Sequence, residues 1–203
     1  MDPRIRRTRD AVLPATLSVL AERGFADFTM EGIAEAAGVS KSTVYRHWPT
    51  KLLLLRDALE GLNRQPDVEL EAGPARVRIE RLLEHLRAAL SDSVVSACIP
   101  ALVEAAERHP EVAEFLHQYS DHRRSTLTAV IRKGIEEGEL PTHLDPELAA
   151  LALSGPIFYR RIMTANPLPA ADIPRLVRQV LGPTSDILTS TMEDIKVSTC
   201  ERP

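Results

Sequence analysis

Apolar residues recur along most of this chain at spacings of three and four, the period of an amphipathic helix. Clear runs are Leu13, Leu17 and Leu20; Ile79, Leu82, Leu83, Leu86 and Leu90; and Ile173, Leu176, Val177, Val180 and Leu181. From Arg76 onward no segment alternates apolar and polar positions as a half-buried strand would. The pattern therefore predicts an all-α fold.

Glycine, proline and capping residues predict where these helices begin and end. Gly24 ends the first helix, residues 63–74 form a loop, and a helix over residues 99–106 has Pro100 near its start. A long stretch from Pro110 to Gly138 can break near Ser120. Asp145, Pro146 and Glu147 begin a further helix, because an acidic N-cap followed by proline favours a helix start. The last helix begins after Asp172 and ends at Gly182 and Pro183.

Residues 29–56 predict three short helices joined by tight turns. Thr29 caps the first, whose apolar positions are Met30, Ile33, Ala34 and Ala37. Gly38 accepts the left-handed backbone that ends this helix and lets the chain reverse. Ser40 and Thr50 cap the next two helices, and Pro49 separates them. This arrangement is a helix-turn-helix.

The second of these helices has one apolar side and one hydrophilic side. Val44 and Trp48 lie four residues apart and face the core. The residues left wholly or partly outward are Lys41, Ser42, Thr43, Tyr45, Arg46 and His47. Such a set suits duplex DNA, because the cations and hydroxyls reach phosphates and Arg46 can bind a guanine edge with two hydrogen bonds.

In the run from Thr29 to Lys51, preceded by Leu-Ala-Glu-Arg-Gly-Phe at residues 20–25, the chain resembles the tetracycline-repressor (TetR) family of bacterial regulators. The resemblance implies a dimer of helical subunits with the first three helices on DNA. It implies base or phosphate contacts from Ser42, Thr43, Tyr45 and Arg46, phosphate contacts from Thr29, Lys41, His47 and Lys51, and Ser40 within the same surface. Pro14 inside the first helix and Trp48, where phenylalanine is commoner, depart from the family pattern.

The same resemblance implies a C-terminal helical bundle for ligand binding and dimerisation. We expect a DNA-binding domain at residues 1–56, a ligand-binding and dimerisation domain at 57–183, and a polar tail at 184–203. The homodimer would form through the last two long helices, with ordinary intramolecular core as the alternative role for them. Phe115, Tyr119, Phe158 and Tyr159 can line a ligand cavity or fill the core, so the ligand-binding residues stay unassigned.

Charge is divided unequally along the chain. Residues 1–56 hold nine Lys or Arg against six acids, a formal charge of +3. Because the net charge of the whole chain is −4, the remaining residues carry a formal charge of −7. A basic N-terminal region below an acidic body suits binding to phosphates. Arg4, Arg6, Arg7 and Arg9 form a basic arm ahead of the first helix, either reaching along DNA or solvated in the free protein.

Other classes of function find little support in the sequence. It holds no nucleophile elbow, phosphate-binding loop, dinucleotide fingerprint or zinc-protease motif, so no enzyme or cofactor is predicted. His117, Asp121 and His122 make an incomplete ligand set, and no metal is predicted. Cys98 and Cys200 lack partner spacing, and Cys98 suits a buried, inert thiol. We expect no membrane segment and a cytoplasmic protein.

The sequence leaves two rival readings of this chain. One is an enzyme without a recognisable catalytic motif, and the other is a helical module that binds a protein partner. The favoured interpretation is a repressor that binds a palindromic operator in double-stranded DNA as a homodimer and is released by a small-molecule effector.

Overall fold

The computed structural model describes residues 3–62, 64–66, 73–91, 93–164 and 166–183, and these residues form nine α-helices and no strand. The helices are α1 (Pro3–Arg23), α2 (Met30–Ala36), α3 (Lys41–His47), α4 (Lys51–Leu62), α5 (Ala75–Ala89), α6 (Val94–Arg108), α7 (Pro110–Glu136), α8 (Pro146–Met163) and α9 (Ile173–Leu181). A short 3-10 turn, Ala170–Asp172, precedes α9. The all-α prediction is confirmed.

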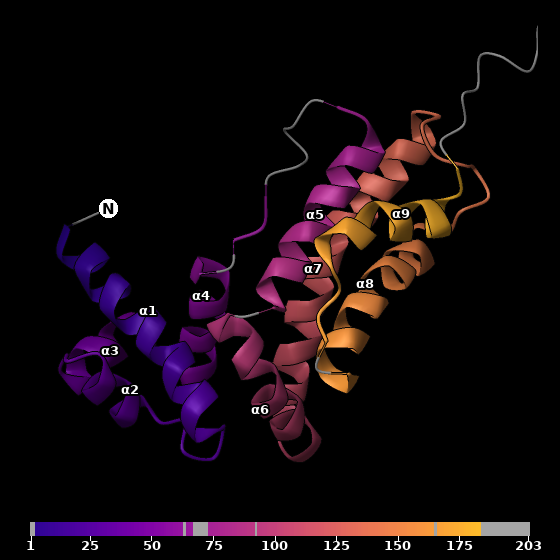
Figure 1. Ribbon diagram of the computed structural model, residues 1–203. Helices are drawn as coiled ribbons and strands as arrows, with labels where there is room; N and C mark the ends of the chain where they lie inside the picture. Colours follow the sequence, from indigo (N-terminus) through magenta and orange to yellow (C-terminus); the bar gives the residue numbers. More distant parts are fainter. Residues whose placement is uncertain (1–2, 63, 67–72, 92, 165, 184–203) are drawn as a thin grey trace, which may run out of the picture.

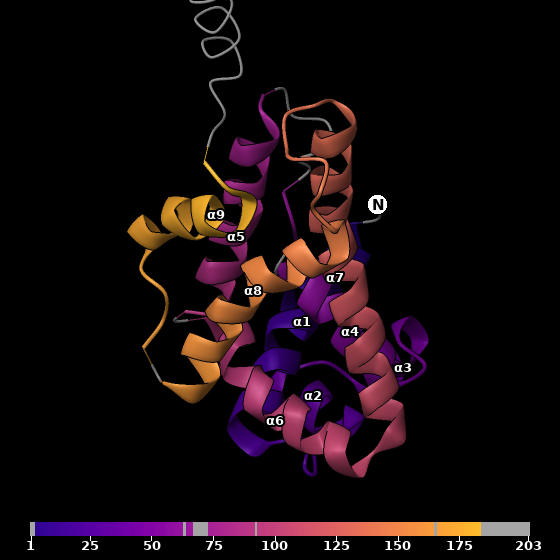
Figure 2. The same cartoon turned by 90° about the vertical axis from the view of Figure 1, so that its right-hand side faces the viewer.

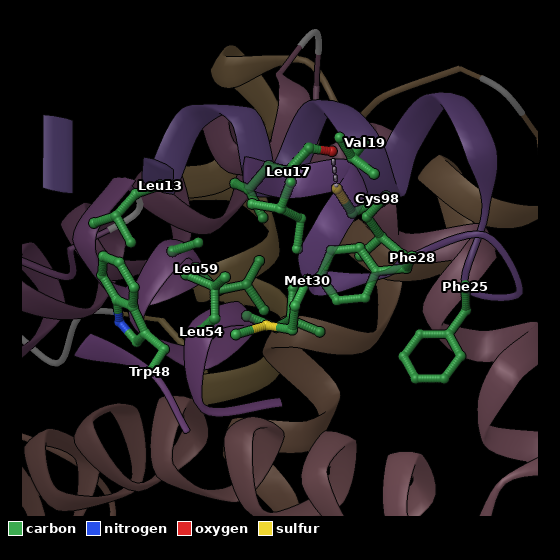
Figure 3. Packing of buried hydrophobic residues seen from close by; sticks show 14 of the residues in the cluster. Leu13, Leu17, Val19, Phe25, Phe28, Met30, Trp48, Leu54, Leu59 and Cys98 are labelled. Atoms are coloured by element: carbon green, nitrogen blue, oxygen red, sulfur yellow. Dashed lines mark hydrogen bonds between the residues drawn. The ribbon is translucent and has the colours of Figure 1, made fainter. Parts of the chain in front are cut away.

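The first four helices pack around one apolar core that α6 and α7 complete (Figure 1). Leu17 of α1, Phe28 of the connection to α2 and Leu54 of α4 are fully buried in it. Figure 3 shows Cys98 of α6 among these side chains, with its Sγ donating to the Leu17 carbonyl oxygen at 3.3 Å. The N-terminal helices are therefore joined to the body by packing as well as by the chain.

A second apolar core lies between α5, α7, α8 and α9. Ile79, Ile131, Leu153 and Leu181 are buried in it, one from each helix. Figures 1 and 2 show α8 and α9 on the side of the molecule away from α2 and α3. The long α7 contributes side chains to both cores. Gly134 of α7 lets α5 and the loop after α7 approach, because a Cβ there would lie 2.7 Å from Ala75 Cβ and 2.9 Å from Leu140 Cδ1.

Several helix bounds differ from the sequence-based expectations. The basic arm is wrong as an arm, because α1 is helical from Pro3 and continues through Pro14. Helix α6 begins at Val94, capped by Ser93, several residues before the expected start, with Pro100 inside it. Helix α7 is continuous past Ser120. Most of the loop expected over residues 63–74, and the tail 184–203, lie outside the described residues.

The helix start at Asp145 is confirmed, since its carboxylate accepts from the Leu148 amide at 2.8 Å. The last helix likewise runs from Ile173 to Leu181 and ends at Gly182. No single helix in the described part of the chain is long and apolar enough to cross a membrane. Helices α5 and α6 reach that length and apolar composition only when they are taken together, as a pair bent by 78°.

Candidate nucleic-acid interface

The turns that shape the helix-turn-helix are built as the sequence predicted. The hydroxyl oxygens of Thr29, Ser40 and Thr50 accept hydrogen bonds from the amides of Gly32, Thr43 and Leu53 at 3.1, 3.2 and 3.2 Å. Gly38 has φ +65°, a value that favours glycine. These caps satisfy amides that would otherwise be left unpaired at the helix starts, and they fix where α2, α3 and α4 begin.

Helix α3 buries one side and leaves its hydrophilic side outward. Val44 is fully buried and Trp48, just after the helix, is 4% exposed, as predicted. Lys41, Ser42, Tyr45 and Arg46 are exposed, and Thr43 and His47 are half-buried. Figure 1 shows α3 at one edge of the molecule, next to α2. A rigid helix with a polar, partly cationic face at an edge can enter a DNA groove.

The remaining predicted contact residues flank this helix. Thr29 and Ser40 are exposed at the starts of α2 and α3, and Lys51 is half-buried at the start of α4. The hydroxyls of Ser40, Ser42 and Thr43 lie together, with 3.0 Å between the Ser40 and Ser42 oxygens and 2.8 Å between those of Ser40 and Thr43. All nine predicted residues therefore lie in or beside the three short helices, and none is buried.

Two of the predicted lysines already make contacts inside the protein. Lys41 forms an ion pair with Glu31 of α2, which raises the pKa of Lys41 and lowers the pKa of Glu31. The Lys41 Nζ also lies 5.6 Å from the centre of the Tyr45 ring. The Nζ of Lys51 lies 4.0 Å from the centre of the Phe25 ring, a cation–π contact. A phosphate that binds either lysine competes with these contacts.

A carboxylate behind the interface joins three elements. Asp57 of α4 accepts two hydrogen bonds from the Arg9 guanidinium, at 2.6 and 2.7 Å, and one from Trp48 Nε1 at 2.7 Å. Arg9 was predicted as part of a DNA-binding arm, but its guanidinium binds this acid instead. Asp57 thereby ties α1 and the end of α3 to α4.

The first turns of α1 still present positive charge. Arg4, Arg6 and Arg7 are exposed there, on helical backbone. They add positive charge to the N-terminal part of the chain, which also holds the helix-turn-helix. Because α1 is helical from Pro3, these arginines have fewer positions open to them than they would have on a free tail.

The body of the protein holds a partly open cavity of about 380 Å³. Its walls come from α5, α6, α7 and α8, and Leu59 of α4 and Gln65 lie beside them. Of the four aromatics weighed from the sequence, Tyr119 and Phe158 line the cavity. Phe115 belongs to the N-terminal core, and Tyr159 is 62% exposed.

Helix α8 carries an exposed apolar face. Its members are Leu148, Leu151, Phe158, Tyr159, Ile162 and Met163, between 37% and 68% exposed. They follow one another at helical spacing, and Gly155 among them has no atom within 4 Å of where a Cβ would lie. A continuous apolar stripe of this kind on a surface marks an interaction site.

Sequence reasoning missed Glu31, Asp57 and, apart from Tyr119, the cavity residues of α7. An acid inside the apolar run of α4 was a usable signal for Asp57, because buried or half-buried carboxylates need partners. The Glu31 partner of Lys41 gave no such signal. No group of three metal-ligating side chains comes together in the part of the chain that the structure describes, where His117, Asp121 and His122 lie.

Comparison with known proteins points in one direction. The family model described as bacterial regulatory proteins, tetR family, matches residues 12–58, and the one described as Tetracyclin repressor-like, C-terminal domain, matches residues 70–180. YdeS of Bacillus subtilis, an uncharacterised HTH-type transcriptional regulator, is 31% identical over 167 residues, or 81% of this chain and 83% of the relative.

Two further proteins agree with this. The DNA-binding transcriptional repressor TetR of Mycobacteroides abscessus is 27% identical over 173 residues, covering 84% of this chain and 90% of its own. The crystal structure of MexZ, a repressor from Pseudomonas aeruginosa, superposes with a TM-score of 0.66 at 26% identity and covers 90% of this chain and 98% of its own. These relatives are transcriptional regulators and not enzymes.

Proposed function

Because this chain belongs to the tetR family of DNA-binding transcriptional regulators, we propose that it is a homodimeric repressor that binds a palindromic operator and is released by a small-molecule effector. The observation that carries this proposal is the division of α3 into a buried side and an exposed side. Val44 is buried, while Lys41, Tyr45 and Arg46 are exposed. Two such helices related by a two-fold axis would enter successive major grooves, about 34 Å apart.

On DNA, the residues of α3 divide by chemistry. Ser42, Thr43, Tyr45 and Arg46 contact bases or phosphates, and Arg46 is the residue able to read guanine with two hydrogen bonds. Thr29, Ser40, Lys41, His47 and Lys51 contact phosphates, which positions the protein without reading sequence. The exposure of these residues and their place around α3 support this assignment.

The homodimer forms through α8, with α9 beside it. Support comes from the exposed apolar stripe of α8, since two copies packed on it would remove Leu148, Tyr159 and Met163 from water. Gly155 within the stripe allows close approach of a partner helix. The exposed side of α9 is polar, with Arg175, Arg178 and Gln179, and suits the rim of such an interface.

The effector binds in the cavity of the C-terminal region, and α4 couples it to the DNA-binding helices. Leu59 of α4 lines the cavity, while Asp57, two residues earlier, holds Arg9 and Trp48. A ligand that displaces α4 therefore changes the position of α3. Moving the protein from mostly bound to mostly free asks for about 5.5 kcal/mol of differential affinity. The proposed domain limits remain 1–56 and 57–183, with the limit inside α4, and the cytoplasm, where such DNA lies, is the proposed location.

Selection of bound sequences from a random duplex pool tests the proposal. Recovery of an inverted repeat, with half-sites one helical turn or a multiple apart, is the expected result. Binding should weaken steeply as salt rises, because phosphate contacts release counterions. Recovery of no sequence, with binding that ignores salt, would instead favour a module that binds a protein partner through the three-helix region.

A further inference from the structure

The cavity that is proposed to bind the effector has walls that are mostly apolar. Leucines and other apolar side chains of α5, α6, α7 and α8 make up most of the lining, with Leu86, Ile99 and Phe158 as examples. Among the described residues that line the cavity, none is Asp or Glu, and the two with a permanent charge are Arg123 and Arg124 of α7. The charge of a fitting ligand therefore depends on how these two arginines are balanced.

Acids of the protein balance both arginines. An Nη atom of Arg124 lies 2.7 Å from Asp121 Oδ1, and its Nε lies 3.6 Å from Glu147 Oε2. Burial lowers the pKa of Arg123, because loss of water disfavours the charged guanidinium, while the negative charge of Glu60 on α4 acts in the opposite direction and favours it. Neither guanidinium thus depends on a ligand for its countercharge.

Uncharged polar groups of the lining are also used within the protein. Gln65 Nε2 donates to the backbone carbonyl oxygen of Arg123 at 2.9 Å, and Ser154 Oγ donates to that of Ala150 at 2.8 Å. The Tyr119 ring packs against the Arg123 guanidinium, whose Cζ lies 5.9 Å from the ring centre. What the cavity offers a ligand is therefore mainly apolar surface.

A charged ligand would lose water on entering this cavity and would meet no unbalanced countercharge in return, so its binding costs free energy. An uncharged ligand avoids that cost, and its apolar part gains by lying against side chains such as Leu86 and Phe158. A cavity of about 380 Å³ falls in the range that holds small organic ligands.

We propose that the cavity binds an uncharged, largely apolar small molecule and discriminates against organic ions of either sign. The inference rests on the proposed function for the idea that this cavity is the effector site. It adds the charge class of the ligand and the reason for it, which is that the arginines of the lining are balanced from within the protein.

The test uses three probes that share an eight-carbon chain and differ in the head group: octanol, octanoate and octyltrimethylammonium. Binding to the full-length protein is measured by calorimetry without DNA, below the concentrations at which the probes form micelles. Octanol should bind about tenfold more tightly than either ion, because only the ions lose the hydration of a charge.

A variant places the octanol in the cavity. Val103 of α6 lines the cavity and is 44% exposed, so Val103→Trp adds bulk at the opening without disturbing a tightly packed core. It should weaken octanol binding at least fivefold, because the indole ring takes up space that the ligand needs. Val77→Trp is the matched control, since Val77 of α5 is 46% exposed and lies outside the lining, and it should bind octanol as the parent does.

Octanoate or octyltrimethylammonium binding as tightly as octanol, absence of octanol binding, or octanol binding that is unchanged in Val103→Trp would overturn the inference. Circular dichroism checks that each variant is folded. If Val103→Trp does not fold, Leu86→Ala decides, since loss of apolar contact there should weaken octanol at least threefold. Because these measurements contain no DNA, their failure leaves the operator selection untouched, and failure of the selection leaves the probe preference untouched.

Discussion

At the scale of single residues, exposure does not make the side chains of α3 equivalent. Arg46 and Lys41 are both exposed, but the Lys41 ammonium is paired with Glu31. The pair holds the Glu31 pKa below its usual value, so its small contribution to stability is present above the ordinary pKa of a glutamate and is lost as the pH falls through the lowered one. A cation that is paired in this way is less available to phosphate.

Removing the charge of Glu31 should therefore strengthen DNA binding. We expect Glu31→Gln to raise affinity for duplex of any sequence by about threefold at low salt and to steepen the salt dependence by about one counterion. Fluorescence anisotropy with labelled duplex at several salt concentrations measures both. Glu35→Gln, an exposed acid on the same short helix, is the control for general charge, and an equal gain from it would remove the special role of Glu31.

Arg46 and Lys51 should differ in what they contribute. Arg46→Ala is expected to relax the preference at one or two positions in each half-site, whereas Lys51→Ala should weaken all sequences alike. Repeating the duplex selection with each variant shows the difference. Unchanged affinity in Lys51→Ala would mean that Lys51 serves only to contact the Phe25 ring.

Cys98 should be chemically silent in the folded protein. Burial raises the pKa of its thiol to about 12, so the thiolate that reacts with disulfide reagents is scarce at pH 8. In a Cys200→Ser variant we expect labelling by Ellman's reagent at least a hundredfold slower than in denaturant, on the order of the loss in thiolate. Because the folded pKa is raised, stability is retained below the ordinary pKa and lost as the pH rises towards 12. Fast labelling in the native state would contradict this.

The sequence was a good guide to residues whose role is local. The caps at Thr29, Ser40 and Thr50 depend on amides three residues away, and Val44 and Trp48 depend on helical period. The ion pair between Glu31 and Lys41 depends on how α2 and α3 cross, which no local pattern encodes. Arg9 was misassigned for the same reason, because its partner lies 48 residues away.

At the scale of helices, Asp57 decides how α4 holds the DNA-binding part. Replacing it with Asn removes the charge from three hydrogen bonds, to Arg9 and to Trp48. We expect Asp57→Asn to lose about 2 kcal/mol of stability and to bind DNA more weakly. Chemical denaturation followed by Trp48, the one tryptophan in the sequence, measures the first. Asp27→Asn, an exposed acid between α1 and α2, should change neither quantity; a stable, fully active Asp57→Asn would show that the junction is dispensable.

Two helical glycines should respond to alanine with opposite signs. Gly134→Ala places a methyl group against Ala75 and Leu140 and should cost about 1–3 kcal/mol. Gly155→Ala meets no atom within 4 Å and should gain up to about 1 kcal/mol from helix propensity. Thermal melts measure both effects. Each alanine variant is made in a Leu148→Glu background, which is intended to be monomeric, so that the melting temperature reports on a single subunit. A loss of stability in Gly155→Ala there would show that the space around Gly155 does not admit a methyl group.

Helix type and order followed from apolar period, while some helix starts did not. The early starts of α1 and α6 use the weakly patterned residues Pro3 to Asp10 and Val94 to Cys98. Arg9 there binds Asp57 of α4, and Cys98 binds the Leu17 carbonyl oxygen of α1. The cavity was also beyond prediction, because its walls come from helices far apart in sequence.

At the scale of the whole molecule, the open apolar stripe of α8 should decide the oligomeric state. We expect Leu148→Glu and Tyr159→Glu, singly or together, to convert a dimer to a monomer and to weaken operator binding, since buried carboxylates would replace apolar contacts. Both residues lie outside the cavity lining. Analytical ultracentrifugation gives the mass. Val77→Glu, which changes an exposed valine of α5, should leave the mass unchanged, and a parent protein that is already monomeric would refute the interface.

The apolar core of the four N-terminal helices includes side chains from outside them. Cys98, Leu102 and Phe115 of α6 and α7 complete it. A fragment that ends at residue 62 would expose to water the apolar surface that α6 and α7 cover. We expect this fragment to aggregate or unfold instead of binding DNA on its own. A hybrid that joins these DNA-binding helices to the ligand-binding domain of another protein would need to include α6 and the first turns of α7. The unit that can be exchanged between proteins is therefore larger than the helix-turn-helix motif in the sequence.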